Sequence, residues 1–513
     1  MANSNTNEPL PVVQRAIVTL GLALGVFMNV LDVSIANVSI PTISGDLGVS
    51  SDDGTWIITS FSVANAVAVP ISGWLARQIG EVRLFVISTL LFTLFSVVCG
   101  FSFSFPMLLV ARVLQGATAG PMIPLSQSLL LPNYPENQRG LANGIWGMTA
   151  VVGPVAGPIL GGWITDNISW SWIFYINLPF GILAAALTWF ILRRRETPKA
   201  SSSLDMIGLA LLLIGVTALQ VMLDKGNDEE WFQSPFIIIN FIIAVIGFAF
   251  FIAWELTEKR PIVDLRLLGQ RNFAVACIII FFGYMSYFAP VVVLPLWLQN
   301  QQGYTPTWAG FATASFGVLG VVASPLVGRL VDKIDLRWIV SAGLGTFAIT
   351  SLLGAFNNTE VNFNLLFLER LPWGVGTACF FIPLITLAMS GISPEKLAGA
   401  SGIFNFLRQI SLSFGTNLGT TIWDHRATFH DHRLNAEVTL YNPATHDWLN
   451  HIQSLGFTAS QANQSLANAI QNQAYVLATN DVAWGSIWIF AILIGVIWLA
   501  RPAKKGAGQV AAE

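Results

Sequence analysis

Charged side chains within long apolar stretches are the residues of this sequence that could do chemistry. Asp32 lies in the first such stretch, and Arg112, Glu369, Arg370 and Arg408 lie in later ones. An acidic side chain at the centre of a membrane helix costs about 2.5–3.5 kcal/mol on insertion scales, so its presence there points to a function. A carboxylate can hold a proton or stay charged beside a cation, which is the physical basis for exchanging one for the other.

A guanidinium within an apolar stretch requires a partner. Asp32 is the acid that the sequence offers to Arg112 in the same half of the chain, so we expect Arg112 to pair with it or tune it. Two alternatives stay open. Asp32 could be a hydrated structural residue at the end of its helix, and Arg112 could bind backbone carbonyls.

Glu369 is a candidate for a second protonation site, or for one partner of a structural ion pair. Adjacent residues of a helix point about 100° apart, so Arg370 need not pair with Glu369. Arg408 is a possible partner instead, although spacing alone does not show the contact.

The composition places these charges in a membrane. Of the 513 residues, 54% are hydrophobic and 10% charged, and the mean hydropathy is +0.64. Soluble chains carry about 25% charged residues. A net charge of -3 gives no case for nucleic acid, and the sequence has no GxxxxGK[ST] phosphate loop. The three cysteines are far apart within apolar runs, where small core residues are expected and a metal or disulfide is not.

Hydropathy predicts an all-α, polytopic membrane protein, because a span requires roughly 20 apolar residues. The fourteen predicted spans are 16–36, 55–76, 84–104, 107–131, 141–165, 172–192, 204–223, 235–255, 273–298, 308–327, 338–356, 363–390, 398–422 and 482–500.

The positive-inside rule predicts the orientation. With the tail 1–14 in the cytoplasm, nineteen of the 25 Lys and Arg residues fall on the cytoplasmic side. Three fall on the far side and three within spans. Both termini are therefore predicted to be cytoplasmic.

One long polar segment, 423–481, lies between the last two spans on the far side. It holds all five histidines: His425, His430, His432, His446 and His451. Their spacing fits no standard metal site. A hairpin that is solvated or binds a partner is the stronger interpretation, with a helix over Ser460–Ala478.

The two ends of the chain resemble each other, which indicates a duplication. Arg112 and Gly116 recur as Arg370 and Gly374, at an offset of 258 residues. The predicted organisation is a six-helix half at 15–195, two inserted helices within 196–260, and a second six-helix half at 261–513. A substrate site is expected between the halves, near the midplane.

A small-residue helix is predicted in the fifth span. Glycines at every fourth position form a smooth face that allows another helix to approach closely, and the prolines can bend the helix. Its residues are Gly147, Gly153, Pro154, Gly157, Pro158, Gly161 and Gly162.

Two related loops on the cytoplasmic side are candidate gating contacts. The first holds Gly73, Arg77, Gly80, Glu81 and Arg83, and the second holds Gly328, Asp332, Lys333 and Arg337.

These motifs, with Leu31–Pro41, resemble those of the major facilitator superfamily, in its fourteen-span drug/proton antiporter branch. The likeness covers nearly the whole chain. The first loop departs from the family pattern: an aspartate is usual where Arg77 stands and a basic residue where Glu81 stands. Arg77 and Glu81 could still pair as an exchanged couple.

The resemblance implies a transporter and not an enzyme. It implies export of hydrophobic drugs across the lipid bilayer by alternating access, with the proton as coupling ion, no other cofactor, and coupling through Asp32, Arg112 and Glu369. It also implies a periplasmic adaptor protein and an outer-membrane channel as partners. Two alternatives stay open: export of one specific metabolite on the same scaffold, or a non-transporting membrane receptor or scaffold.

Overall fold

The structure is a computed structural model. It describes residues 9–135, 138–197, 199, 205–259, 261–331, 333–393, 396–439 and 441–502. These residues form helices and no strand, which confirms the predicted all-α class. Asp332 lies outside the described residues.

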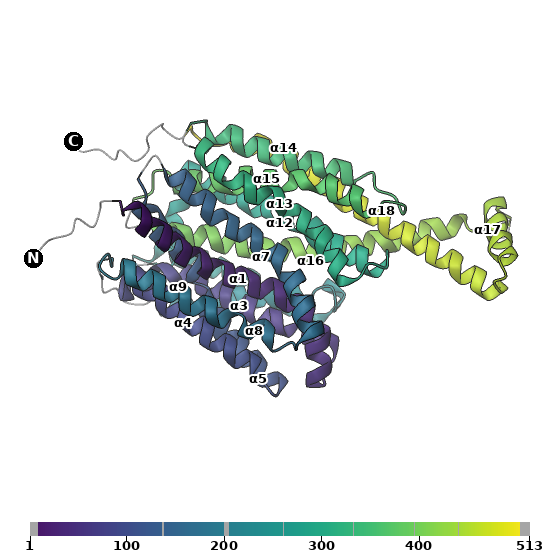
Figure 1. The fold of residues 1–513 in the computed structure, drawn as a ribbon, viewed down its shortest axis with the longest axis horizontal. Coiled ribbons are helices and arrows are strands. Elements are labelled where there is room, and N and C mark those ends of the chain that lie inside the picture. The colour runs from purple at the N-terminus through teal and green to yellow at the C-terminus, as the bar shows by residue number, and fades with distance from the viewer. Residues whose placement is uncertain are drawn as a thin grey trace, which may run out of the picture.

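A first half precedes an inserted pair of helices, and a second half follows it (Figure 1). The first half contains α1 (Val12–Leu47), α2 (Ser51–Gly54), α3 (Trp56–Ile79), α4 (Glu81–Gly100), α5 (Phe105–Ala119), α6 (Met122–Leu130), α7 (Arg139–Asn167), α8 (Trp172–Tyr175) and α9 (Asn177–Leu192). The inserted pair is α10 (Met206–Lys225) and α11 (Pro235–Thr257). The second half contains α12 (Arg271–Asn300), α13 (Pro306–Val331), α14 (Leu336–Gly354), α15 (Phe363–Met389), α16 (Leu397–Glu437), α17 (Pro443–Ser454) and α18 (Ala459–Val496).

Each predicted span coincides with one long helix or with a consecutive pair. Within the described ranges, twelve spans have the length and apolar composition needed to cross a membrane. The remaining two predicted spans fall on α7 and α16, which pack between other long helices of the bundle. The structure is therefore consistent with fourteen spans. Helix α1 begins and α18 ends at the same end of the bundle (Figure 1), as an even number of crossings requires.

The helices of each half pack mainly on one another. Helix α1 packs on α7 and α9, and α12 packs on α16 and α18. The halves meet where α7 packs on α13, and where α3 and α6 pack on α16. The inserted helices pack on each other, and α10 also contacts α3 and α16. The exact domain boundaries stay predictions.

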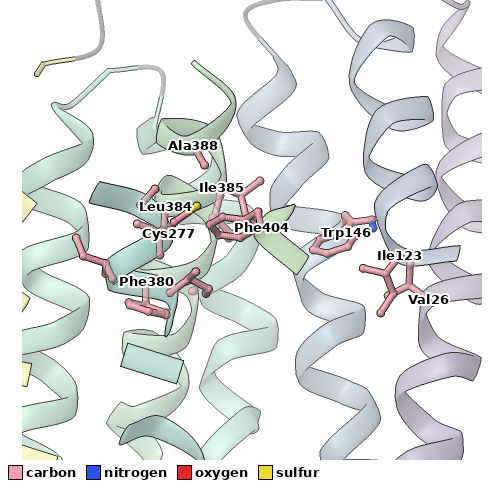
Figure 2. Packing of buried hydrophobic residues seen from close by; sticks show 14 of the residues in the cluster. Val26, Ile123, Trp146, Cys277, Phe380, Leu384, Ile385, Ala388 and Phe404 are labelled. Carbon is pink, nitrogen blue, oxygen red and sulfur yellow. The ribbon is translucent and has the colours of Figure 1, made fainter. Parts of the chain in front are cut away.

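One apolar core continues across both halves (Figure 2). Trp146 of α7 lies between Val26 and Ile123 on one side and Phe404 of α16 on the other. Its indole donates a hydrogen bond to Ser126 Oγ at 2.8 Å, which satisfies the buried N–H.

The polar segment 423–481 is a helical extension that projects from the bundle (Figure 1). Helix α16 continues to Glu437, 15 residues past the predicted end of its span, and α18 begins at Ala459, far ahead of its span. The predicted spans are shorter than these helices because hydropathy indicates only the part of a helix that lies in the membrane. The polar continuations contain no Gly or Pro, so the helices do not end there. The predicted helix over Ser460–Ala478 is confirmed as part of α18.

One acidic residue joins the two long helices at the base of this extension. Asp481 of α18 accepts hydrogen bonds from Arg426 Nε at 2.6 Å and pairs with His430 Nε2 at 2.7 Å, both on α16. The two long helices are therefore tied together where they leave the bundle.

Candidate functional site

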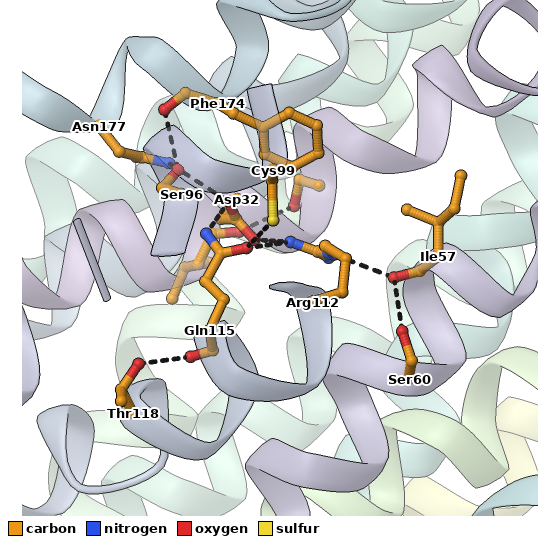
Figure 3. Close-up of polar contacts among 12 residues, drawn as sticks. Asp32, Ile57, Ser60, Ser96, Cys99, Arg112, Gln115, Thr118, Phe174 and Asn177 are labelled. Atoms are coloured by element: carbon orange, nitrogen blue, oxygen red, sulfur yellow. Dashed lines mark hydrogen bonds and ion pairs between the residues drawn. The ribbon is translucent and has the colours of Figure 1, made fainter. Parts of the chain in front are cut away.

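Several helices of the first half bring polar side chains together around Asp32 (Figure 3). Asp32 lies near the middle of α1, and Arg112 and Gln115 lie one turn apart on α5. Ser96 comes from α4 and Asn177 from the start of α9. Within largely apolar helices, these are the side chains that can satisfy a buried charge.

The Asp32 carboxylate accepts three hydrogen bonds. Arg112 donates to Oδ2 at 2.5 Å, Gln115 Nε2 donates to Oδ1 at 2.9 Å, and Asn177 Nδ2 donates to Oδ1 at 3.2 Å. These three donors provide the buried carboxylate with hydrogen-bond partners for both oxygens.

Arg112 is held by more than its acid. Its Nε donates to the backbone carbonyl of Ile57 at 3.0 Å, and its Nη1 also donates to Gln115 Oε1 at 2.8 Å. The guanidinium lies over the ring of Phe61, 4.3 Å from the centroid, and 5.6 Å from that of Phe174. Both alternatives for Arg112 are thus present at once, since it binds an acid and a carbonyl.

The pair is sealed from solvent. Both side chains of the Asp32–Arg112 pair are 0% exposed. The hydrated position considered for Asp32 is therefore wrong. The helix was expected to end at residue 36, but α1 continues to Leu47, so Asp32 is well inside it. Removing one partner of such a pair leaves an uncompensated buried charge, at a cost of about 3–5 kcal/mol.

Sequence reasoning named the charged pair but missed the amides and hydroxyl that complete it. Ser96 Oγ receives a bond from Asn177 Nδ2 at 3.0 Å and donates to the Phe174 carbonyl at 2.8 Å. The spacing of Gln115, three residues after Arg112, places both on one helix face and was an available signal. No pattern in the sequence connects Asn177 with Asp32, 145 positions away.

The small-residue face of α7 packs on the stretch of α1 that carries Asp32. A Cβ on Gly153 would lie 2.6 Å from Val30 Cγ1, and one on Gly161 would lie 2.9 Å from the Ile35 carbonyl oxygen. A Cβ on Gly157 would overlap the Ser34 side chain. The close approach of α7 therefore depends on these glycines, so the position of α7 is coupled to that of Asp32 although the two do not touch.

The other residues of this motif take different places. Gly147 faces the second half, where its Cβ would lie 3.4 Å from Ile382 Cγ1. Gly162 is buried in α7, and the helix runs through Pro154 and Pro158 without a break.

The charged residues of the second half do not form a matching pair. Arg370 is 5% exposed, its Nε has no hydrogen-bond partner, and its guanidinium lies 5.5 Å from the centroid of the Phe316 ring. Glu369 lies beside Asn357, whose amide nitrogen in its favoured orientation is 3.2 Å from the carboxylate oxygens. Among the described residues no ion pair joins Glu369 to Arg408.

Arg408 lies at the seam between the halves. It lines a small, mainly apolar cavity together with Trp146 and Gly147 of α7 and Phe381 of α15. Its guanidinium lies 5.7 Å from the centroid of the Tyr284 ring. This cavity has walls from both halves.

The seam is closed toward the end where α1 begins. Gln127 Oε1 of α6 accepts bonds from Ser401 Oγ at 2.7 Å and from Asn405 Nδ2 at 3.1 Å, both on α16. A Cβ on Gly144 of α7 would lie 2.6 Å from the Ser324 carbonyl oxygen of α13. The described conformation therefore has its halves in contact at this end.

In the first candidate gating loop, a residue that the sequence did not indicate binds the start of the following helix. Glu196 accepts bonds from the backbone N–H groups of Val82 and Arg83, each at 3.0 Å, and so caps α4. Gly80 adopts φ 98°, which favours glycine, and Gly73 is buried in α3.

The exchanged couple is not formed in this part of the described chain. Glu81 accepts a bond from Ser128 Oγ at 2.8 Å, and no ion pair joins it to Arg77. Arg77 instead interacts electrostatically with Asp264 of the second half, which also pairs with Lys396 at 2.8 Å. Sequence spacing suggested a local pair, but Asp264 approaches only when the halves come together.

In the second loop Arg337 pairs with Asp335, with 2.7 Å between Nη2 and Oδ2. Arg337 holds the pKa of the Asp335 carboxyl below its usual range through these hydrogen bonds. Gly328 lies in α13 beside Gly144, and Lys333 follows that helix as an exposed residue.

This architecture defines a polytopic membrane transporter built from two similar halves. The family model of the Major Facilitator Superfamily matches residues 22–416, most of the chain. The protein belongs to this superfamily.

Curated relatives are similar over nearly their whole length. The Multidrug export protein EmrB of Escherichia coli (strain K12) is 45% identical over 502 residues, covering 98% of each chain. The Fatty acid resistance protein FarB of Neisseria gonorrhoeae is 43% identical over 500 residues, covering 98% of this chain and 99% of that protein. The predicted resemblance to this branch of the superfamily is confirmed.

A solved structure shows the same fold. The proton:xylose symporter XylE, bound to 6-bromo-6-deoxy-D-glucose, matches with a TM-score of 0.57 at 14% identity, covering 91% of this chain and 94% of that one. At that identity the likeness concerns the fold alone.

Proposed function

We propose that this protein exports hydrophobic drugs in exchange for protons. The observation that carries the proposal is the fully buried Asp32–Arg112 pair on the helix that the small-residue face of α7 contacts. Burying an acid within a membrane costs free energy, so its presence there points to a function. Intramembrane acids mark proton relays. The EmrB relative is a multidrug export protein, which supports this substrate class.

The proposed cycle follows from the charges around Asp32. In the described conformation the charged acid is satisfied by three donors. A proton on Asp32 would remove the negative charge that Arg112 neutralises, so the site must rearrange. Since α7 packs on both sides of Asp32 along α1, movement of α7 with α13 would open the site to one side at a time. Glu369 is a second candidate for a proton.

The proposed setting is the bacterial inner membrane, with both termini in the cytoplasm. The distribution of Lys and Arg supports this orientation, and the common position of the start of α1 and the end of α18 agrees with it. The closed end of the seam formed by Gln127, Ser401 and Asn405 is then the cytoplasmic end.

The test is substrate-dependent proton flux in proteoliposomes that contain the purified protein. We expect the Asp32→Asn variant to lose substrate-induced proton release, because the neutral amide cannot exchange a proton. Glu369→Gln serves as the matched variant in the other half. Intact proton release from Asp32→Asn would show that Asp32 is not the coupling acid.

Two alternatives have their own outcomes. The FarB relative, a fatty acid resistance protein, favours a narrower substrate range. A response to one compound among many in a binding panel would support a specific exporter. No flux of any compound under a pH gradient would support a receptor or scaffold.

We also propose a periplasmic adaptor protein and an outer-membrane channel as partners. The support is the helical extension of α16, α17 and α18, which carries the exposed Tyr441, Trp448 and Phe457 beyond the bundle. Deleting part of 440–475 is expected to preserve folding and weaken adaptor binding, since Asp481 still closes the base. Unchanged co-purification with the adaptor would contradict this proposal.

A further inference from the structure

The end of α10 joins the inserted pair to both halves of the protein. It lies beside α3 of the first half and α16 of the second, which also pack on each other. This is the end of the seam opposite to Gln127, because Asn417, which bonds Asp224, lies more than four turns further along α16 than Ser401, which bonds Gln127. A polar cluster lies there, and neither the family motifs nor the proposed coupling pair uses it.

One carboxylate connects all three helices. Asp224 of α10 accepts a hydrogen bond from Asn417 Nδ2 of α16 at 3.0 Å and from Gln220 Nε2 of its own helix at 3.2 Å. The Thr59 hydroxyl of α3 also hydrogen-bonds to it. Each of these donors comes from a different helix, so the charged acid holds the three together.

Neighbouring hydrogen bonds also join the inserted pair to both halves. Gln220 Nε2 also donates to Ser413 Oγ of α16 at 2.6 Å, and Lys225 Nζ donates to Thr55 Oγ1, just before α3, at 2.9 Å. Trp231 Nε1, in the loop after α10, donates to Thr421 Oγ1 of α16 at 3.0 Å. The inserted pair therefore bonds to both α3 and α16 and holds them together at this end of the seam.

The charged groups near Asp224 are few. Lys225 follows it on α10, is 8% exposed, and pairs with Asp228 at 3.2 Å. Asp424 of α16 accepts a bond from Asn227 Nδ2 at 3.2 Å. Thr59 on α3 and Asn417 on α16 are neutral, so the charge on Asp224 decides how these helices are held.

We infer that Asp224 is a second proton-binding carboxylate of the transport cycle, supplied by the inserted helices, whose charged form clamps α3 to α16. The inference rests on the proposed proton-coupled export.

The physical step is the gain of one proton on a carboxylate oxygen. An ionised carboxylate only accepts hydrogen bonds, whereas a protonated one has an O–H that must donate. Asn417, Gln220 and Thr59 present donors to Asp224. Protonation therefore weakens the bonds across the seam and favours separation of α3 from α16 at this end.

The experiment measures that separation in the full chain, reconstituted in lipid nanodiscs. Spin labels are attached through Phe103→Cys, in the exposed loop before α5, and His432→Cys, on the exposed part of α16. Protein without these two substitutions corrects for labelling of the native cysteines. The distance distribution is recorded at pH 8 and pH 5 by electron double resonance.

We expect the otherwise unsubstituted chain to shift toward longer distances at pH 5, because protonation releases the clamp. Asp224→Asn should give the longer distances at both pH values, and the exposed Glu230→Gln in the following loop should behave as the unsubstituted chain. Asn417→Ala removes the same bond from the other side and should also give the longer distances. This second variant serves if Asp224→Asn does not fold.

Distances in Asp224→Asn and Asn417→Ala that follow the unsubstituted chain at both pH values would overturn the inference. Substrate-driven proton flux in the same preparations separates the two proposals. If flux persists and depends on Asp32 while the distances ignore Asp224, only the clamp is wrong. If the unsubstituted chain shows no substrate-driven flux, the proposed function fails independently of the distance result.

Discussion

The two halves of this protein place an arginine at the same point of a duplicated scaffold and surround it differently. Arg112 and Arg370 are both buried, and both guanidinium groups lie over a phenylalanine ring, Phe61 or Phe316. Arg112 binds an acid at 2.5 Å, whereas Arg370 has an Nε without a partner and α12 carries no acidic residue.

The next turn of the helix shows the same contrast. Gln115 of the first half bonds Asp32, and the residue at the corresponding position of the second half is Trp373. Trp373 packs on the rings of Phe347 at 4.8 Å and Phe316 at 5.2 Å between centroids. One half thus has a hydrogen-bonded polar centre and the other an aromatic centre.

The packing outside these centres is nevertheless shared. Gly157 and Gly161 of α7 press against α1, and their counterparts Gly415 and Gly419 of α16 press against Met285 and Ala289 of α12. The two halves therefore share their helix packing, whereas the buried Asp32–Arg112 pair lies in the first half. The inserted pair adds a contact across the seam.

The largest expected difference between the halves concerns the two arginines. Arg112→Gln leaves Asp32 charged, buried and without its partner, so we expect a loss of about 3–5 kcal/mol in stability. Arg370→Gln removes a cation that forms no ion pair in the described part of the chain and interacts with the neighbouring Glu369 only at longer range, so we expect a smaller loss. Thermal unfolding of both variants in one detergent measures the difference.

Two further results bear on this comparison. The double substitution Asp32→Asn with Arg112→Gln should recover much of the lost stability, because no charge is then left alone. Equal losses from Arg112→Gln and Arg370→Gln would show that Arg370 has a counter-charge of its own.

A smaller effect is expected from the glycine faces. Gly157→Ala places a methyl group against Ser34 on α1, and overpacking of this kind typically costs about 1–3 kcal/mol. Because α1 carries Asp32, we expect Gly157→Ala to reduce substrate-induced proton release more than Gly415→Ala does. Proton release per mole of folded protein is the measurement.

Gly485→Ala on α18 is the matched control, since its Cβ would meet nothing within 4 Å. Equal loss of proton release in the Gly157 and Gly415 variants would mean that both halves move the proton together, and the contrast drawn above would fail.

Much of the fold could be predicted because it depends on local sequence. The apolar runs located the twelve helices that have the length and composition of membrane spans, and the recurring Arg and Gly positions indicated two similar halves. The ends of α16 and α18 could not be obtained in this way, because hydropathy follows the membrane and helix continuation follows the absence of Gly and Pro. The pair that Arg77 and Glu81 could have formed is not present, because Glu81 bonds Ser128, on a helix that spacing does not reveal.

The sequence by itself determined that this chain crosses a membrane many times, that its two halves resemble each other, and that Asp32 and Arg112 are costly residues and candidate partners. The length of the apolar runs and the charges within them carry that information, because the free energy of placing each segment in lipid depends on its own residues. Only the tertiary structure decided which neutral side chains complete the site, that α7 contacts α1 on either side of Asp32, and that Asp224 joins α10 to both halves. Such contacts depend on the packing of helices far apart in sequence. The presence of an amide or hydroxyl in the sequence does not indicate which residue it will bond.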